Sequence, residues 1–80
     1  MTPIRLEKRV PGENQCRFYR LLLAPTLFGE WSLIREWGRI GQPGTVRVDL
    51  FATMEEAAAA QAKKAVSKLR TGYLQIIFDW

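Results

Sequence analysis

Histidine is absent from this 80-residue chain, and cysteine occurs once, at Cys16. Without histidine, neither Cys16 nor the serines Ser32 and Ser67 has the usual general base for nucleophilic catalysis, so we do not expect an enzyme. A single cysteine excludes a disulfide within the chain, and it cannot build a Cys/His zinc site. The sequence therefore predicts no catalytic residue, no metal site and no cofactor.

Long apolar runs are also lacking. No stretch approaches the roughly 20 apolar residues of a membrane span, and residues 1–10, MTPIRLEKRV, lack the apolar core of a secretory signal. We therefore expect a cytoplasmic protein that has no membrane partner. The chain is 48% hydrophobic and 25% charged and has no repeat or linker, which is typical of one globular domain over residues 1–80.

Acidic residues are fewer than basic ones, 8 against 12, which gives a net charge of +4. This excess favours anionic partners over cationic ones. The acids that lie near the centre of the sequence alternate with arginines, which favours cross-strand ion pairs over a catalytic pair of carboxylates. These residues are Glu30, Glu36 and Asp49, beside Arg35, Arg39 and Arg47.

The stretch from Glu30 to Gly44, EWSLIREWGRIGQPG, is the centre of the sequence. Successive side chains of a strand point to opposite faces, so one face of this strand interleaves aromatic side chains with arginines. That face holds Trp31, Leu33, Arg35, Trp37 and Arg39. Gly41-Gln42-Pro43-Gly44 then predicts a tight turn in which both glycines are free to take positive φ.

Three more segments read as strands of the same sheet. Thr2–Val10 alternates apolar and charged residues, which suits an edge strand, and Gln15–Ala24 is apolar enough for the middle of the sheet. Between it and the central strand, Ala24–Gly29 is expected to be a loop whose Phe28 packs back on the sheet. Thr45–Ala52 predicts a strand with a mostly polar outer face of Arg47 and Asp49.

A helix is predicted from Met54, because Thr53 and Glu56 form a capping box and two acids occupy the first turn. Gly72 is expected to end it. Its apolar arc contains Met54, Ala58, Ala62, Ala65, Val66 and Leu69. Tyr73–Trp80 reads as a last strand or a tail, and Trp80 is expected either to pack on its own sheet or to contact a second copy.

These elements predict an α+β fold, an antiparallel sheet of four to five strands with one amphipathic helix packed on one face. One helix covers one face of the sheet. We therefore expect the functional surface on the open face.

Three separate motifs resemble a known family. They are Arg17-Phe18-Tyr19, the sequence W-G-R-I-G from Trp37 to Gly41, and Lys68–Tyr73 at the end of the helix. In this order they resemble the WGR domain, which occurs in DNA-damage-sensing poly(ADP-ribose) polymerases and in small bacterial proteins. The resemblance covers about Asn14 to Gln75. It implies an antiparallel sheet with one helix and a surface that binds nucleic acid.

The resemblance also implies roles for individual residues. Trp37 would pack on the sugar at a nucleic-acid end or break, and Arg39 would contact phosphate. Arg17 would either contact phosphate or be a solvated charge. The residues alone leave Trp37 open, because a tryptophan in a small sheet domain is also a common core residue. Cys16 stands where the family often has asparagine, so a backbone contact from that position is not carried over. The expected nucleic-acid-binding residues are Trp37, Gly38, Arg39, Arg17, Arg35 and Tyr73.

Other residues keep a structural alternative. Trp31 is expected in the core or as support for the aromatic face, and Lys63, Lys64 and Lys68 are either solvated or in contact with DNA.

The sequence supports two functions from different classes. The first is a non-catalytic module that recognises DNA ends, nicks or breaks through backbone and sugar contacts. The second is a protein-interaction module that docks the same basic aromatic face on an acidic protein. DNA and RNA are not distinguished, and both a monomer and a weak homodimer are compatible with the sequence.

Overall fold

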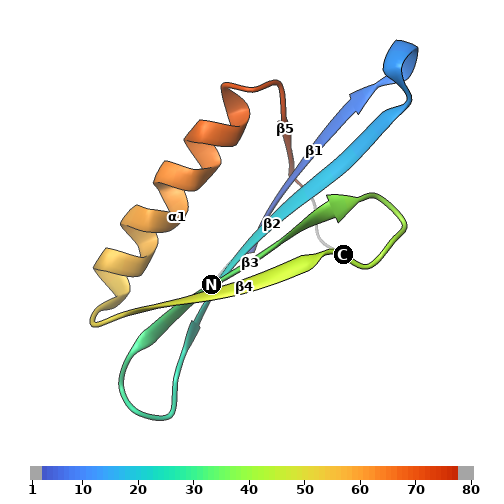
Figure 1. Ribbon diagram of the computed structural model, residues 1–80. Coiled ribbons are helices and arrows are strands. Elements are labelled where there is room, and N and C mark those ends of the chain that lie inside the picture. The colour runs from blue at the N-terminus through green and yellow to red at the C-terminus, as the bar shows by residue number, and fades with distance from the viewer. Residues whose placement is uncertain (1–2, 78–80) are drawn as a thin grey trace.

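The computed structural model describes residues 3–77, which form a five-stranded antiparallel sheet with one helix across one face (Figure 1). The elements are β1 (Ile4–Val10), a short 3-10 helix η1 (Pro11–Glu13), β2 (Gln15–Pro25), β3 (Trp31–Arg39), β4 (Thr45–Phe51), α1 (Met54–Leu69) and β5 (Leu74–Ile76). The α+β class predicted from the sequence is confirmed. The expectation for Trp80 falls outside the described residues.

The strand order is β4-β3-β2-β1-β5, so β2 lies in the middle of the sheet, as its apolar sequence predicts. The prediction that the first strand is an edge is wrong. Residues Arg5–Glu7 of β1 pair with Leu74–Ile76 of β5, which returns after the helix to cover this side. The edges are therefore β4 and β5.

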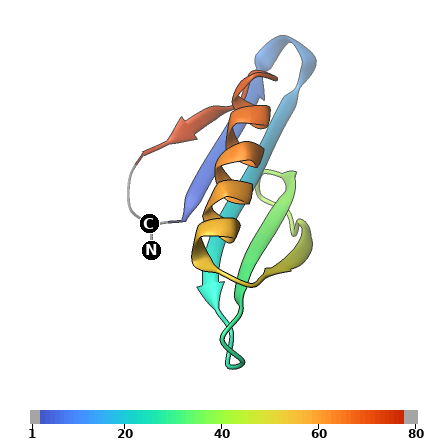
Figure 2. The ribbon, with the colours of Figure 1, turned by 90° about the vertical axis from the view of Figure 1, so that its left-hand side faces the viewer.

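The core lies between the sheet and α1, which lies along one face of the sheet (Figure 2). Register places alternate residues of β1, β2 and β3 on the helix side, where Leu6 pairs with Tyr19 and Leu23 pairs with Leu33. The buried apolar side chains of this layer are Leu6, Tyr19, Leu21, Leu23, Leu33, Ala57 and Ala65. Trp31 packs against this cluster, in agreement with its predicted supporting role.

Helix α1 begins at Met54, as predicted, and the Thr53 hydroxyl accepts the backbone N–H of Glu56. The predicted apolar arc is correct only in part. Ala65 is buried and Ala58 packs against the core, as predicted. Met54, Val66 and Leu69 are exposed, however, and Ala57, which lies outside the predicted arc, is buried. The buried face is thus rotated from the predicted one by about a quarter turn at 100° per residue. The rotation brings Gln61 to the sheet, where its amide donates to the Leu21 carbonyl over 3.4 Å.

Strand β4 carries its residues on the faces opposite to those predicted. Val46, Val48 and Leu50 lie on the open face and are more than half exposed, while Arg47 and Asp49 lie on the helix side. Asp49 turns inward because Arg35 of β3 is buried and charged. A buried guanidinium needs an anionic partner, and Asp49 supplies it at 3.0 Å.

The loop after β2 also differs from the prediction. Pro25 is the last residue of β2 and pairs with Trp31, so the loop begins one residue later, where the Thr26 N–H donates to the Glu30 carbonyl. Phe28 does not pack on the sheet. It is 89% exposed, because the two strands close the loop at its base and leave its tip in solvent.

The turn between β3 and β4 uses its two glycines for different reasons. Gly41 has a φ of 87°, as predicted, but Gly44 does not adopt positive φ. A Cβ atom on Gly44 would lie 2.6 Å from the Trp37 carbonyl oxygen. Close approach of the backbone, and not the φ angle, therefore requires glycine at this position.

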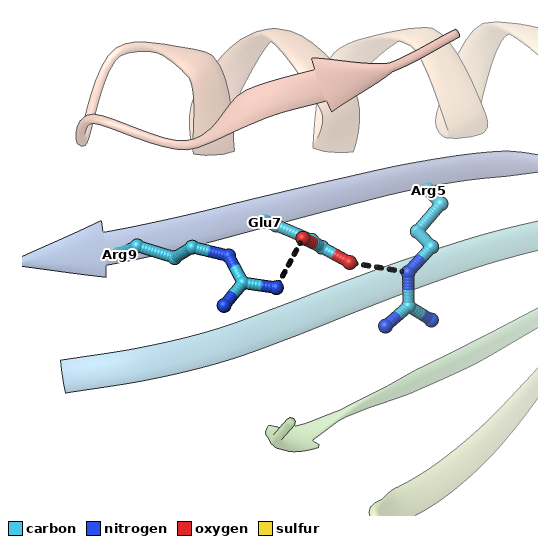
Figure 3. Close-up of polar contacts among 3 residues, drawn as sticks. All are labelled: Arg5, Glu7 and Arg9. Carbon is cyan, nitrogen blue, oxygen red and sulfur yellow. Dashed lines mark hydrogen bonds and ion pairs between the residues drawn. The ribbon is translucent and has the colours of Figure 1, made fainter. Parts of the chain in front are cut away.

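The open face carries an ion triad along β1, shown in Figure 3. Arg5 Nε donates to Glu7 Oε2 over 2.8 Å, and Arg9 Nη2 donates to Glu7 Oε1 over 3.1 Å. The hydrogen bond from Arg5, with a smaller contribution from Arg9, holds the pKa of Glu7 below its ordinary value of 4.5, although partial burial opposes the shift. On the open face, Arg5 and Arg9 thus share Glu7 as their acidic partner, and Arg20 is paired with Glu36.

Residues 3–77 contain no helix with the length and apolar character that crossing a bilayer demands.

Candidate nucleic-acid interface

Register aligns three basic residues across the sheet. Lys8 of β1 pairs with Arg17 of β2, and Arg17 pairs with Arg39 of β3. Directly paired residues of an antiparallel sheet lie on the same face with Cα atoms about 4.5 to 5.5 Å apart. The three residues, which we call the basic row, therefore form one line of positive charge across three strands.

The basic row lies on the helix side of the sheet. The side chain of Lys8 reaches toward the turn after α1, because a Cβ atom on Gly72 would meet Lys8 Cε at 3.4 Å. Trp37 and Arg39 are two residues apart on β3 and share this face. The expectation that the site residues occupy the open face is thus corrected, since they line the helix-bearing face beside the end of α1.

An aromatic pair forms the neighbouring row. Tyr19 pairs with Trp37, and their rings are stacked with centroids 5.7 Å apart and an interplanar angle of 16°. Tyr19 is buried, whereas Trp37 is half-buried and packs against the core without joining it. Trp37 is thus neither a fully buried core residue nor a fully exposed one, because part of its side chain packs against the core and part remains accessible to solvent.

Lys68 and Tyr73 complete the basic and aromatic surface at the end of α1. Lys68 Nζ lies 4.8 Å from the centroid of the Tyr19 ring and 5.7 Å from that of Tyr73. Lys8 Nζ lies 6.0 Å from the Tyr73 centroid. Cations at such distances are attracted to the ring faces, so both lysines are held near the aromatic rings.

Arg35 lies on the other side of Trp37 and is engaged within the chain. It is 8% exposed, its guanidinium carbon lies 5.7 Å from the Trp37 ring, and its Nη1 donates to the Tyr19 hydroxyl over 3.4 Å. The hydrogen bond with Tyr19 raises the pKa of Arg35 above its ordinary value, and Asp49 adds to this effect. Arg35 therefore stays charged, and its contacts hold both aromatic rings in position.

A hollow of about 130 Å³ opens at the end of the basic row. It is lined by Asn14, Gln15, Cys16, Arg17, Gly38 and Arg39. Asn14 has a φ of 54° and closes η1, which points its carbonyl at Arg39 Nη2 over 3.2 Å. The Ile40 N–H donates to the Cys16 carbonyl and extends the strand pairing past Arg39. The hollow is thus shaped by backbone, with two arginines at its rim.

Gly38 has a structural function in the turn. It lies opposite Phe18, and a Cβ atom on it would approach Gly44 Cα to 3.1 Å and Phe18 Cε1 to 3.6 Å. Phe18 is 5% exposed although it faces away from the helix, because the turn after β3 and the Arg5 guanidinium, 5.1 Å from its ring centroid, cover it. Gly38 therefore permits the turn to close over Phe18.

Within residues 3–77, the basic row has no carboxylate partner, and neither has Lys68. Five other arginines each form an ion pair with a carboxylate, namely Arg5, Arg9, Arg20, Arg35 and Arg47. Like charges that face one another across strands repel, so an uncompensated row is destabilised until an anion neutralises it. Such a surface suits a polyanion with flat or apolar groups, because guanidinium groups bind phosphate and aromatic rings stack.

The described residues do not assemble a metal site, since no three Cys, Asp or Glu side chains in this part of the chain lie close enough together.

Two residues of this surface were missed from the sequence. Lys8 lies outside the motifs that resemble the family, and Tyr19 was noted in a motif but not selected for the site. Their position depends on the register between β1, β2 and β3. Tyr19 could have been selected from the sequence, because it lies two residues after Arg17 and therefore on the same face of the strand.

The chain is similar in sequence to known proteins. A family model described as WGR domain matches residues 2–77. A relative from Sinorhizobium fredii (strain NBRC 101917 / NGR234), described as uncharacterized protein y4dW, is 37% identical over 73 residues. The aligned part covers 89% of this chain and 36% of the relative, so the chain spans about a third of that protein's length. No solved structure matches the chain at a significant level.

Proposed function

The chain belongs to the WGR domain family, whose domains are generally nucleic-acid-binding modules, and from this premise we propose that it is a non-catalytic module that recognises DNA ends, nicks or breaks. It would do so through the phosphate backbone and the sugars, without reading base sequence. The binding surface we propose is the basic row together with the Tyr19–Trp37 pair, Lys68 and Tyr73.

One observation carries the proposal: the uncompensated line of Lys8, Arg17 and Arg39 lies one row away from a half-buried tryptophan. Phosphate groups of one strand would neutralise the line. The solvent-facing part of Trp37 would then pack against a sugar or base at the end of the strand. Only at an end or break is the face of a terminal nucleotide not covered by a stacked neighbour.

The residues that the sequence predicts to bind nucleic acid take different parts in the proposal. Arg17 and Arg39 contact phosphate at the hollow, and Tyr73 holds Lys8 and Lys68 at the surface. We propose a supporting role for Arg35, because Tyr19 and Asp49 already occupy its guanidinium. Gly38 acts through the shape of the turn and not through contact with DNA.

Fluorescence anisotropy with three DNA molecules of the same sequence tests the proposal: a closed duplex circle, the same circle with one nick, and a linear blunt duplex. We expect the nicked and linear forms to bind more tightly than the closed circle. Equal affinity for all three would show that the protein binds the DNA backbone without preference for ends or nicks. Absence of binding to all three at low salt would overturn the nucleic-acid function. The acidic-protein alternative would then be favoured.

Binding is expected to be weak and sensitive to salt, because three or four cations are available to phosphate. With a slope near −0.9 for each contact, raising salt from about 50 to 200 mM should weaken binding roughly 40- to 150-fold. The cytoplasmic location remains a prediction from the sequence.

A further inference from the structure

Strand β4 forms one edge of the sheet and has an unusual composition for an edge. It pairs with β3 on one side only, and the part of the chain described by the structure places no strand on its other side. Its outward residues Val46, Val48 and Leu50 are 58%, 53% and 56% exposed. A seven-residue edge strand with one apolar row and unpaired N–H and C=O groups is a template for pairing with another strand.

We propose that β4 pairs with β4 of a second copy of this chain, antiparallel and centred on Val48, to give a two-fold symmetric dimer. The sequence of β4, TVRVDLF, is complementary to itself in this register. Val48 faces the partner's Val48, and Val46 faces the partner's Leu50. Arg47 faces the partner's Asp49, and the two-fold axis repeats the same ion pair on the other side.

Charge selects this register over its neighbours. A shift that centres the pairing on Arg47 places two arginines opposite one another, and a shift that centres it on Asp49 places two aspartates there. Like charges directly opposite one another destabilise the pairing, whereas opposite charges stabilise it. A shift by a single residue places Arg47 opposite the partner's Leu50, so it mixes the polar and apolar faces.

Arg47 has room for this partner. Its side chain is 67% exposed and lies 3.7 Å from Asp49 of its own strand, a long contact compared with the 3.0 Å pair between Asp49 and Arg35. Asp49 is 34% exposed, so it accepts a second cation without losing Arg35. Arg47 and Asp49 can therefore each form an ion pair with the second copy.

The proposed dimer also continues both faces of the sheet. Directly paired residues point to the same side, so both copies carry α1 on one face and their Val46, Val48 and Leu50 side chains adjoin on the other. The opposite edge offers no equivalent surface, because β5 has three residues. A single shared strand buries little area, so the dimer should be weak and dependent on concentration.

Sedimentation equilibrium tests the proposal over chain concentrations up to about 1 mM, where a dimer with a dissociation constant of about 1 mM or below becomes visible. We expect the wild-type mass to rise from one chain toward two. Val48→Lys should remain at one chain, because it places two ammonium groups at the two-fold axis. Leu74→Lys is the matched control, since it changes an exposed apolar residue on the same face at the other edge.

Oxidative cross-linking tests the register without relying on Val48→Lys. In a Cys16→Ala background, Val48→Cys should form a disulfide dimer, because directly paired Cα atoms lie within disulfide range. Val46→Cys should not, since four residues of offset separate the two cysteines by about 13 Å. A wild-type mass of one chain throughout, a dimer that persists in Val48→Lys, or equal cross-linking at both positions would each overturn the proposal.

Discussion

Arg39 owes its proposed role to its neighbours in the sheet. It lies opposite Arg17 and is anchored by the Asn14 carbonyl at the rim of the hollow. Arg39→Ala removes one charge that releases counterions on binding. We expect weaker DNA binding and a salt dependence that is shallower by about 0.9 in the slope of log K against log salt, measured by anisotropy at several salt concentrations.

Arg9→Ala is the matched control for Arg39→Ala, because Arg9 is exposed, carries the same charge and lies on the opposite face. It should leave the salt slope nearly unchanged. Equal slopes for the two variants would show that net charge, and not the basic row, determines binding.

Trp37 should show a different pattern, because stacking is a short-range apolar contribution. Trp37→Ala should weaken binding by about 1 to 3 kcal/mol while leaving the salt slope nearly intact. Since Trp37 is half-buried against Tyr19, its removal should also lower the free energy of unfolding by roughly 1.5 to 2.5 kcal/mol, about half the cost for a fully buried aromatic residue. Titration of DNA and chemical denaturation measure the two effects.

Trp31→Ala provides the comparison, because Trp31 is half-buried on the same face at the other end of β3. It should cost stability without a specific loss of affinity. A folded Trp37→Ala protein with wild-type affinity would remove Trp37 from the binding surface.

Glu7 gives the domain a component of stability that depends on pH. Its pKa is lowered in the folded state, so its contribution is present above its ordinary value of 4.5 and is lost as the pH falls through the folded-state pKa. Glu7→Gln should therefore reduce the free energy of unfolding at neutral pH by about 0.5 to 1 kcal/mol, and by almost nothing in strong acid. Denaturant unfolding at both pH values measures this, with the exposed Glu13→Gln as control. A deficit that persists in acid would assign the effect to packing.

Among the elements, the turn from β3 to β4 depends most strictly on glycine. A Cβ on Gly44 would meet the Trp37 carbonyl oxygen at 2.6 Å and Phe18 Cζ at 2.9 Å. Gly44→Ala should therefore destabilise the domain by about 1 to 3 kcal/mol, as overpacking does elsewhere. Gly12→Ala is the matched control, because a Cβ there meets nothing within 4 Å. Equal melting temperatures for the two variants would contradict the close approach.

The sequence predicted the identity of the elements better than their orientation. Alternation and the Thr53 cap located β2, β3, β4 and the start of α1, because these signals are local. The face that each element buries is decided by contacts between elements. The ion pair with buried Arg35 places Asp49 on the helix side of the sheet and therefore places the valines of β4 on the open face. The sequence of β4 alone does not indicate this.

For the whole molecule, the motifs proposed Trp37, Arg39 and Arg17 as binding residues, but the sequence did not show that their side chains lie on the same face of the sheet as α1. The basic row exists only through the register of three strands, so Lys8 was not predictable without it. The same register gives two distinct faces. One has uncompensated cations and aromatic rings beside α1, and the other has ion-paired arginines and exposed apolar residues of β4.

This difference between the two faces allows a direct test of the central claim that nucleic acid binds on the helix-bearing face. We would record ¹H–¹⁵N correlation spectra of the protein while titrating a short blunt-ended DNA hairpin at low salt. Shift changes should concentrate on Lys8, Arg17, Tyr19, Arg39 and the indole N–H of Trp37. The side-chain Nε–H signal of Arg20, whose side chain lies on the open face, should move little. Changes concentrated on the open face, or none at saturating DNA, would contradict the account.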